Sequence, residues 1–245
     1  MKTSPLTTTE RLYSKYNTLN RRATIEDPKI RQISFESMRR SLGPWLPPDR
    51  ATPILDIACG EGALLAFLTD EGYTNLSGFD ISPENVAICH RLGLSFVQGG
   101  DAFALLQTEE PNRFGLICAI DLIEHIPKEQ AAQLIEVMRS KLQSNGSLIL
   151  QTPNAGSLYA SHNRYYDLSH YFAVTEKSAT DLMMLGGFSI DEIEIRPHWN
   201  AVTSLGRLRE LYVLLIHKLI FLGEGNRRPR ISTSNLLIRG TRRSQ

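Results

Sequence analysis

Strand-like and helix-like segments alternate along the chain from residue 53 onward, and this alternation constrains the fold more than any other feature. "PILDIA" and "LSGFD" have the length and apolar composition of buried strands. The helical segments between the strands have clear ends, with Ser82 placed as an N-cap, Thr175 beginning a later helix and Gly186 ending it. Alternation of this kind predicts a mostly parallel sheet with helices on both faces.

The other predicted elements follow the same rhythm. The remaining strands are expected at 95–101, 114–121, 146–153, 188–195 and 234–242, and the helices at 61–72, 82–93, 128–142 and 175–187. Residues 1–50 are expected to form an N-terminal helical cap that ends at a pair of prolines, and 51–245 the main domain. A helical insertion is expected at 204–223, before the last strand.

Ligands in parallel sheets bind at the carboxyl ends of the strands, where this chain places glycines and acids. The first strand leads into "DIACGEG", in which Gly60 and Gly62 allow a tight turn and a close approach to a ligand. Asp80 ends the second strand and is placed to bind ribose hydroxyls, and Asp101 ends the third beside apolar residues that suit an adenine. The third glycine of a dinucleotide fingerprint is replaced by Leu65, which disfavours a dinucleotide-binding oxidoreductase.

In this order, "DIACGEG", "GFD", "GGDAF" and "LICAIDLIEHI" resemble the motifs of class I S-adenosylmethionine (SAM)-dependent methyltransferases. The resemblance spans roughly 50–197 and implies SAM as cofactor and a Rossmann-like, seven-stranded sheet. It implies that Asp56, Gly60 and Gly62 line the methionine part, that Asp80 holds the ribose and that Asp101 and Ala102 hold the adenine. The other cofactor residues that it implies are Ala58, Ile81, Ile120 and Asp121.

A narrower resemblance begins at residue 151. "QTPNAGSLYASHNRYYDLSHYFAVTEKSATDLMMLGGF", with "IEH" at 123–125 and "RR" at 21–22, resembles the sugar O-methyltransferases of O-antigen, lipopolysaccharide and related glycan pathways. Gln151 stands where that family usually has a glutamate. The resemblance implies an acceptor segment at 151–175 and a sugar or lipid-linked glycan as acceptor. The activity that this resemblance implies is that of an O-methyltransferase of glycan biosynthesis.

Transfer to a hydroxyl needs a base, and histidine titrates near neutral pH. His125 lies just beyond the fourth strand and is the first candidate, while His170 is an alternative base or an acceptor-binding residue. Asp167, three residues before His170, is placed to orient the His170 ring. Tyr165, Tyr166 and Tyr171 offer flat faces and hydroxyls to a sugar.

Two other functions remain open. Quinone-pathway O-methyltransferases also resemble this region and can bind a divalent cation through an acid-x-x-Glu-His cluster, here Asp121, Glu124 and His125. We favour no metal, with Asp121 facing the cofactor and Glu124 at a solvated helix start. The third function is that of a cofactor-binding scaffold without turnover.

Charge and composition bound the partners and the location. Residues 205–245 carry a net charge of +7 and the remainder −6, and an acidic main domain argues against nucleic acid as a partner. Three widely spaced cysteines are expected to be reduced thiols in a cytoplasmic protein. The basic, apolar segment 205–230 is expected to pack on the sheet or cover the acceptor. Peripheral contact with the inner membrane surface and a dimer contact stay open.

Overall fold

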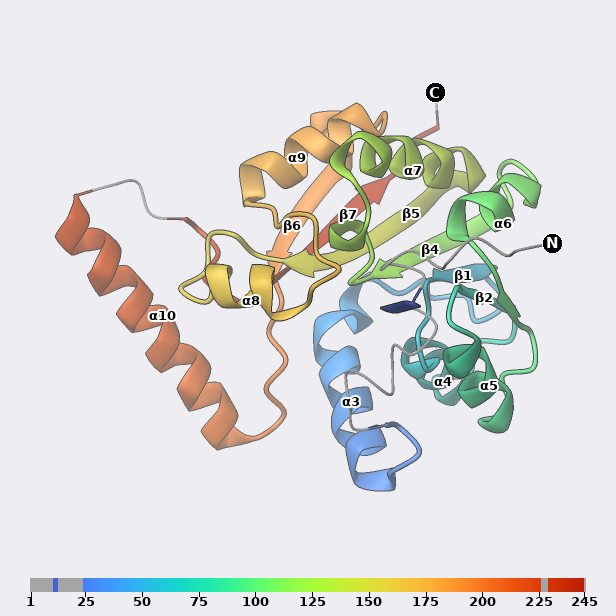
Figure 1. Ribbon diagram of the computed structural model, residues 1–245, viewed down its shortest axis with the longest axis horizontal. Coiled ribbons are helices and arrows are strands. Elements are labelled where there is room, and N and C mark those ends of the chain that lie inside the picture. Colours follow the sequence, from blue (N-terminus) through green and yellow to red (C-terminus); the bar gives the residue numbers. More distant parts are fainter. Residues whose placement is uncertain (1–10, 13–23, 226–228, 245) are drawn as a thin grey trace.

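The computed structural model describes residues 11–12, 24–225 and 229–244, and its centre is a seven-stranded sheet (Figure 1). The strand order is β3-β2-β1-β4-β5-β7-β6, and β7 runs antiparallel to both of its neighbours while the other pairs are parallel. The predicted mostly parallel sheet is therefore confirmed. The strands are β1 Ile54–Ile57, β2 Leu76–Asp80, β3 Val97–Gly99, β4 Phe114–Ile120, β5 Leu142–Pro153, β6 Ile193–Pro197 and β7 Asn235–Thr241.

Helices cover both faces of the sheet, as expected (Figure 1). One face packs against α6, α7 and α9, and the other against α3, α4 and α5. Each face has its own apolar core, because successive strand residues point to opposite sides. The helices are α3 Pro28–Ser41, α4 Ala63–Asp70, α5 Pro83–Arg91, α6 Ala102–Thr108, α7 Lys128–Lys141, α8 Ala160–Tyr166, α9 Glu176–Leu185 and α10 Ser204–Glu224, with short 3₁₀ turns at Gly43–Trp45, Ile123–His125 and Ile190–Glu192.

Local capping explains both the successes and the errors in the element boundaries. Ser82 and Thr175 cap α5 and α9 with their side chains, as predicted. The strand expected at 188–195 is partly wrong, because Ser189 and Glu192 cap a 3₁₀ turn and the strand starts only at Ile193. The sequence analysis also missed α6, whose N-cap is Asp101.

The sheet order places the crevice for a ligand between β1 and β4. From β1 the chain proceeds outward through β2 and β3, and then returns to β4 on the other side of β1. Loops at the carboxyl ends of these two strands leave in opposite directions, which opens a crevice at that edge.

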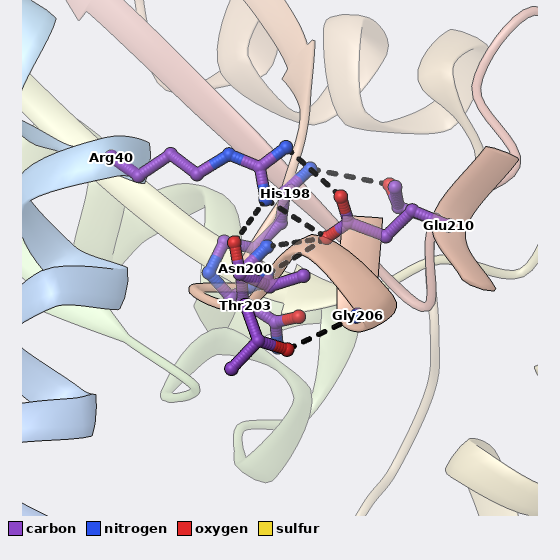
Figure 2. Close-up of polar contacts among 8 residues, drawn as sticks. Arg40, His198, Asn200, Thr203, Gly206 and Glu210 are labelled. Carbon is purple, nitrogen blue, oxygen red and sulfur yellow. Dashed lines mark hydrogen bonds and ion pairs between the residues drawn. The ribbon is translucent and has the colours of Figure 1, made fainter. Parts of the chain in front are cut away.

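Helix α10 lies at the margin of the molecule (Figure 1) and not on the sheet. The alternative expectation, that this segment covers part of the acceptor site, stays open, because Gly206 and Arg209 of its first two turns line the main cavity. The amino end of α10 is held by the Glu210 carboxylate, which accepts hydrogen bonds from Arg40 of α3 at 2.9 Å and from the backbone of Asn200 and Ala201 at 3.1 and 2.8 Å (Figure 2). Further along the helix, the His217 ring contacts the Gly156 carbonyl at 3.1 Å. Among the described residues, these polar contacts join the two halves of the helix to the rest of the chain.

Three other expectations concern regions that the structure describes only in part. Residues 1–10 and 13–23 of the expected cap, with the arginine pair at 21–22, lie outside the described residues, as do Arg227 and Arg228. Within the described ranges, no helix combines the length and apolar character needed to cross a bilayer. Cys59, Cys89 and Cys118 are buried free thiols, so the expectation of unpaired cysteines is confirmed.

The burial of His198 next to the Glu210 anchor predicts a measurable pH dependence of stability (Figure 2). Burial lowers the pKa of His198 to about 4, although the Glu210 charge acts to raise it. Because the pKa of His198 is lower in the folded chain, the unfolded chain takes up the proton first as the pH falls. The stability that the neutral His198 ring contributes is therefore complete above about pH 6.5 and is lost as the pH falls towards 4. We expect His198→Gln to lose less stability than the wild type between pH 7 and pH 4.5, measured by urea unfolding.

The comparison of His198→Gln with the wild type isolates this group from the other titrations. His162→Gln, at an exposed position of α8, is the control and should follow the wild-type pH dependence. Identical pH dependence of all three proteins would contradict the assignment.

Candidate active site

A cavity of about 1490 Å³ lies along the carboxyl ends of β1, β2, β4 and β5. The α3 helix and the segment that leads into α10 form other parts of its wall. Ligand pockets commonly measure about 300–1,000 Å³, so this cavity has room for two ligands side by side. Nine of the ten predicted cofactor residues line it: Asp56, Ala58, Gly60, Asp80, Ile81, Asp101, Ala102, Ile120 and Asp121.

The turn after β1 has the backbone of a ligand-binding loop. Ala58 and Gly60 both have a left-handed φ of 56°. This conformation costs an L-residue roughly 1–2 kcal/mol, which explains why a glycine is the commoner choice where this chain has Ala58. A Cβ at Gly60 would meet nothing within 4 Å, so the cavity side of this turn is open.

The carboxylate of Asp80 joins this turn to the start of α5. It accepts hydrogen bonds from the backbone of Gly60 and Ser82, both at 2.8 Å, and from the Asn85 amide at 2.9 Å. Burial nevertheless raises the pKa of Asp80, because these three bonds offset only part of the cost of removing the carboxylate from water.

Asp56, at the third position of β1, brings a second carboxyl group to the same part of the cavity. Its side chain is 2% exposed, and burial, followed by the charge of Asp80, raises its pKa well above the ordinary value. A cation bound beside these two carboxyl groups would relieve their repulsion and favour their ionised forms. The sulfonium and ammonium groups of SAM are ligands of this kind.

Gly62 is the exception among the predicted cofactor residues. It caps α4 with a φ of 79°, and a Cβ there would lie 2.6 Å from Leu94 and 2.9 Å from Cys89. The glycine is therefore needed for the close packing of α4 on α5, and Gly62 does not line the cavity.

Asp101 and Asp121 stand at the other two strand ends. Asp101 is exposed and accepts a hydrogen bond from the backbone of Ala104 at 3.0 Å, which leaves part of its carboxylate for a ligand. Asp121 accepts a bond from the Gln151 amide at 3.0 Å. A glutamate at 151, usual in the resembling family, could not donate this bond when ionised, so glutamine suits its neighbour here.

His125 lies at the end of a chain of hydrogen bonds that begins at Asp167. The Ser169 hydroxyl donates to Asp167 at 2.5 Å, and His125 Nδ1 lies 2.7 Å from the same oxygen. Because the serine has already given its only hydrogen to the carboxylate, it must accept from His125. The proton of a neutral His125 then sits on Nδ1, which makes Nε2 the proton-accepting atom of the ring.

Asp167, which was expected to orient His170, is linked to His125 through the Ser169 hydroxyl. His170 Nδ1 is 2.9 Å from the Asn163 carbonyl, and the hydrogen bonds of the Asp167 side chain lead to His125 through Ser169. The loop turns back at Asp167, and this turn places the Ser169 hydroxyl between the Asp167 carboxylate and His125 Nδ1. The two imidazole rings are 4.7 Å apart and meet edge to face.

The tyrosines of the acceptor segment have different positions. Tyr166 and Tyr171 line the cavity, whereas Tyr165 is 78% exposed and stacks with Arg164 outside it. The acceptor surface expected from three tyrosines is therefore made by two.

Glu124 corrects another expectation, since it is buried rather than at a solvated helix start. Burial, followed by the charges of Asp121 and Asp167, raises its pKa well above the ordinary value, although the Thr152 hydroxyl donates to it at 3.1 Å. Glu124, His125 and His170 place ligand atoms within 4.8 Å of one another and form the candidate cation site of the described residues. This group has His170 in place of the Asp121 considered from the sequence.

Several lining residues had no sequence signal that pointed to the cavity. The wall formed by α3 and its flanking residues combines apolar side chains with serine hydroxyls, and the segment around the start of α10 contributes polar side chains from more than a hundred residues further along the chain. Helical periodicity identifies an apolar face but not what it faces. The lining residues concerned are Ile25, Ile30, Ile33, Met38, Leu42, His198, Asn200 and Arg209.

Comparisons with known proteins agree with this site. Residues 28–192 match the model of the family described as "Methyltransferase domain". The ubiquinone biosynthesis O-methyltransferase of Xylella fastidiosa (strain 9a5c) is 29% identical over 105 residues, which are 41% of this chain and 42% of that protein. The match thus spans about two fifths of the curated relative's length.

Solved structures show the same fold. A SAM-dependent methyltransferase from Archaeoglobus fulgidus superposes with a TM-score of 0.66 at 19% identity, over 94% of this chain and 99% of that chain. Phosphoethanolamine N-methyltransferase 2 of Haemonchus contortus, in complex with SAM, gives a TM-score of 0.56 at 17% identity, over 86% of this chain and 52% of that chain. The chain therefore belongs to the methyltransferase domain family and has the fold of the SAM-dependent methyltransferases.

Proposed function

We propose that the protein transfers the methyl group of SAM to a hydroxyl oxygen, and that its acceptor is a phenolic, quinone-type small molecule. The observation that carries the proposal is the chain Asp167–Ser169–His125, which sets the tautomer and orientation of a His125 ring that lines the cavity. A hydroxyl is a weak nucleophile until its proton leaves, and a positioned base contributes about 10²–10⁴-fold. Asp167, acting through Ser169, would stabilise the imidazolium that forms.

The donor side of the cavity supports SAM. Asp56 and Asp80 place two carboxyl groups where the cationic methionine part would bind, and its positive charge would favour their ionised forms. The open turn at Gly60 allows a close approach, and Asp101 and Ala102 flank the place for the adenine. The methyl group leaves an activated sulfonium, so much of the acceleration comes from alignment of donor and acceptor, for which well-oriented systems gain about 7–11 kcal/mol.

Two observations favour a phenolic acceptor. The curated relative that matches acts, by its name, in ubiquinone biosynthesis as an O-methyltransferase. In addition, the wall formed by α3 and the residues on either side of it includes Ile25, Ile30, Met38 and Leu42, together with the hydroxyls of Ser34, Ser37 and Ser41. An aromatic ring with a hydrocarbon substituent can bury itself against the apolar side chains of this wall, whereas the hydroxyls of a sugar would lose hydrogen bonds to water there.

A sugar hydroxyl is the second candidate, favoured by Tyr166 and Tyr171 in the cavity lining. Aromatic faces and phenolic hydroxyls suit a sugar ring, and Asn163 and Gln130 add polar groups nearby. A scaffold without turnover is the alternative from a different class.

One experiment separates these functions. We expect the purified protein to bind SAM by calorimetry and to methylate catechol-type phenols in preference to nucleotide sugars and free glycans. Transfer to the sugars alone would assign the second candidate. Binding without transfer to either class would favour the scaffold, and absence of SAM binding would refute methyl transfer altogether.

Asp56→Asn tests the donor site through both stability and binding. Because the pKa of Asp56 is raised in the folded state, its protonated form contributes stability at low pH, and this stability is lost as the pH rises from about 4 through the raised pKa. An amide at this position does not ionise, so Asp56→Asn should make the ligand-free protein more stable at pH 7. The same change removes a negative charge from the donor site and should weaken SAM binding roughly 10- to 100-fold. Urea unfolding and calorimetry measure the two effects.

Asp70→Asn is the control for this variant, because it removes a carboxylate at the exposed end of α4. It should change neither quantity appreciably. Unchanged SAM affinity in Asp56→Asn, or a loss of stability, would contradict the donor-site assignment.

Variants of the two histidines test the base. His125→Ala should lower kcat about 10²–10⁴-fold and leave SAM binding unchanged, because only the proton transfer is lost. Ser169→Ala should lower kcat less and shift the pH–rate profile, since the imidazole loses its link to Asp167. His170→Ala should mainly raise KM for the acceptor.

Two results would overturn this assignment. Loss of transfer in His170→Ala with retention in His125→Ala would make His170 the base. Loss of activity on chelation, with recovery on adding magnesium, would make Glu124, His125 and His170 ligands of a cation that activates the hydroxyl.

A further inference from the structure

The outer face of α10 carries a stripe of exposed apolar side chains that the methyl-transfer site does not use. We define the α10 stripe as Leu205, Leu208, Tyr212, Leu215, Leu219 and Leu222, with Leu211 beside it. All seven side chains are between 53% and 78% exposed. In Figure 1 the helix forms the edge of the molecule, and none of the other described elements lies beyond it.

The spacing of the α10 stripe is that of a coiled-coil seam. Its six positions are separated by 3, 4, 3, 4 and 3 residues, so they fill the a and d positions of three successive heptads. A strict 3.5-residue repeat is the pattern that fits another helix packed alongside. The opposite face of α10, with Glu210 and the buried His217, is already anchored to the rest of the chain.

From this spacing we propose that the α10 stripe is a dimer interface, in which α10 packs against α10 of a second copy of this chain. The inference concerns assembly and does not rest on methyl transfer. A two-fold pair brings the same patch of both copies together, so one self-complementary helix face is sufficient.

Charges beside the stripe allow this pairing. In a parallel pair the flanking positions bring Leu211 against Ile216 of the second copy. In an antiparallel pair they bring Leu211 against Lys218, and Arg209 against Ile216. Neither arrangement places two like charges directly opposite each other, so the basic side chains of α10 do not oppose the contact.

The area of the stripe is that of a small interface. A fully exposed large aliphatic side chain offers roughly 60–120 Å² of apolar surface for burial. Because the seven side chains are 53–78% exposed, they offer roughly 270–540 Å² on each copy, against about 800 Å² per partner in a typical stable interface.

Light scattering on a sizing column and sedimentation velocity test the proposal with the full-length protein. We expect the wild type to run with twice the mass of one chain, and Leu215→Glu to weaken the dimer ~100-fold or more, since the change affects two symmetry-related copies. Leu208→Glu is a second variant with the same expectation. Leu185→Glu, at a 73% exposed leucine of α9, is the matched control and should remain dimeric.

Circular dichroism and SAM affinity establish that each variant is folded, so loss of the dimer is separable from loss of the fold. A wild type that is monomeric over the whole dilution series would overturn the proposal. So would a dimer that survives both glutamate variants. Flotation of a monomeric wild type with anionic phosphatidylglycerol vesicles, abolished by Leu215→Glu, would assign the stripe to a lipid surface instead.

Discussion

The three hydrogen bonds to the Asp80 carboxylate are the interaction on which the rest of the site depends. They join the turn after β1 to the start of α5, and so fix the shape of the floor of the cavity. The buried negative charge that results is costly in the free protein and is made more costly by Asp56. The site thus trades stability for affinity towards a cation, which is a common exchange at functional sites.

Much of the fold follows from local signals in the sequence. Ser82 and Thr175 cap their helices with their own side chains, and such caps act within three residues of sequence. For the same reason Asp56, Asp80 and Asp121 were placed correctly at the cavity, because the end of each parallel strand opens on the same edge of the sheet. The extra turn at Ile190–Glu192 was missed because an alternating apolar pattern also matches a short capped turn followed by a strand.

The parts that could not be predicted depend on how loops return to the sheet. Asp167 is closer in sequence to His170, and only the folded loop shows that its side chain reaches His125 through Ser169. Gly62 was predicted from its motif to line the cofactor site, but Leu94 and Cys89 on a neighbouring segment leave no room for a side chain at this position. In both cases the deciding neighbours come from elsewhere in the chain, beyond the reach of spacing arguments.

The same histidine pair could serve as a base or as cation ligands, and the buried carboxyl groups help to decide between them. Burial raises the pKa of Glu124, and the negative charges of Asp121 and Asp167 raise it further. The raised pKa favours the protonated form of Glu124 in the free protein. A protonated Glu124 is a poor cation ligand, so a cation must first displace that proton. Asp167 accepts the hydrogen bond of the Ser169 hydroxyl, whose oxygen faces His125 Nδ1, so the Asp167 charge would stabilise an imidazolium there. This arrangement supports the proposal that His125 is the base.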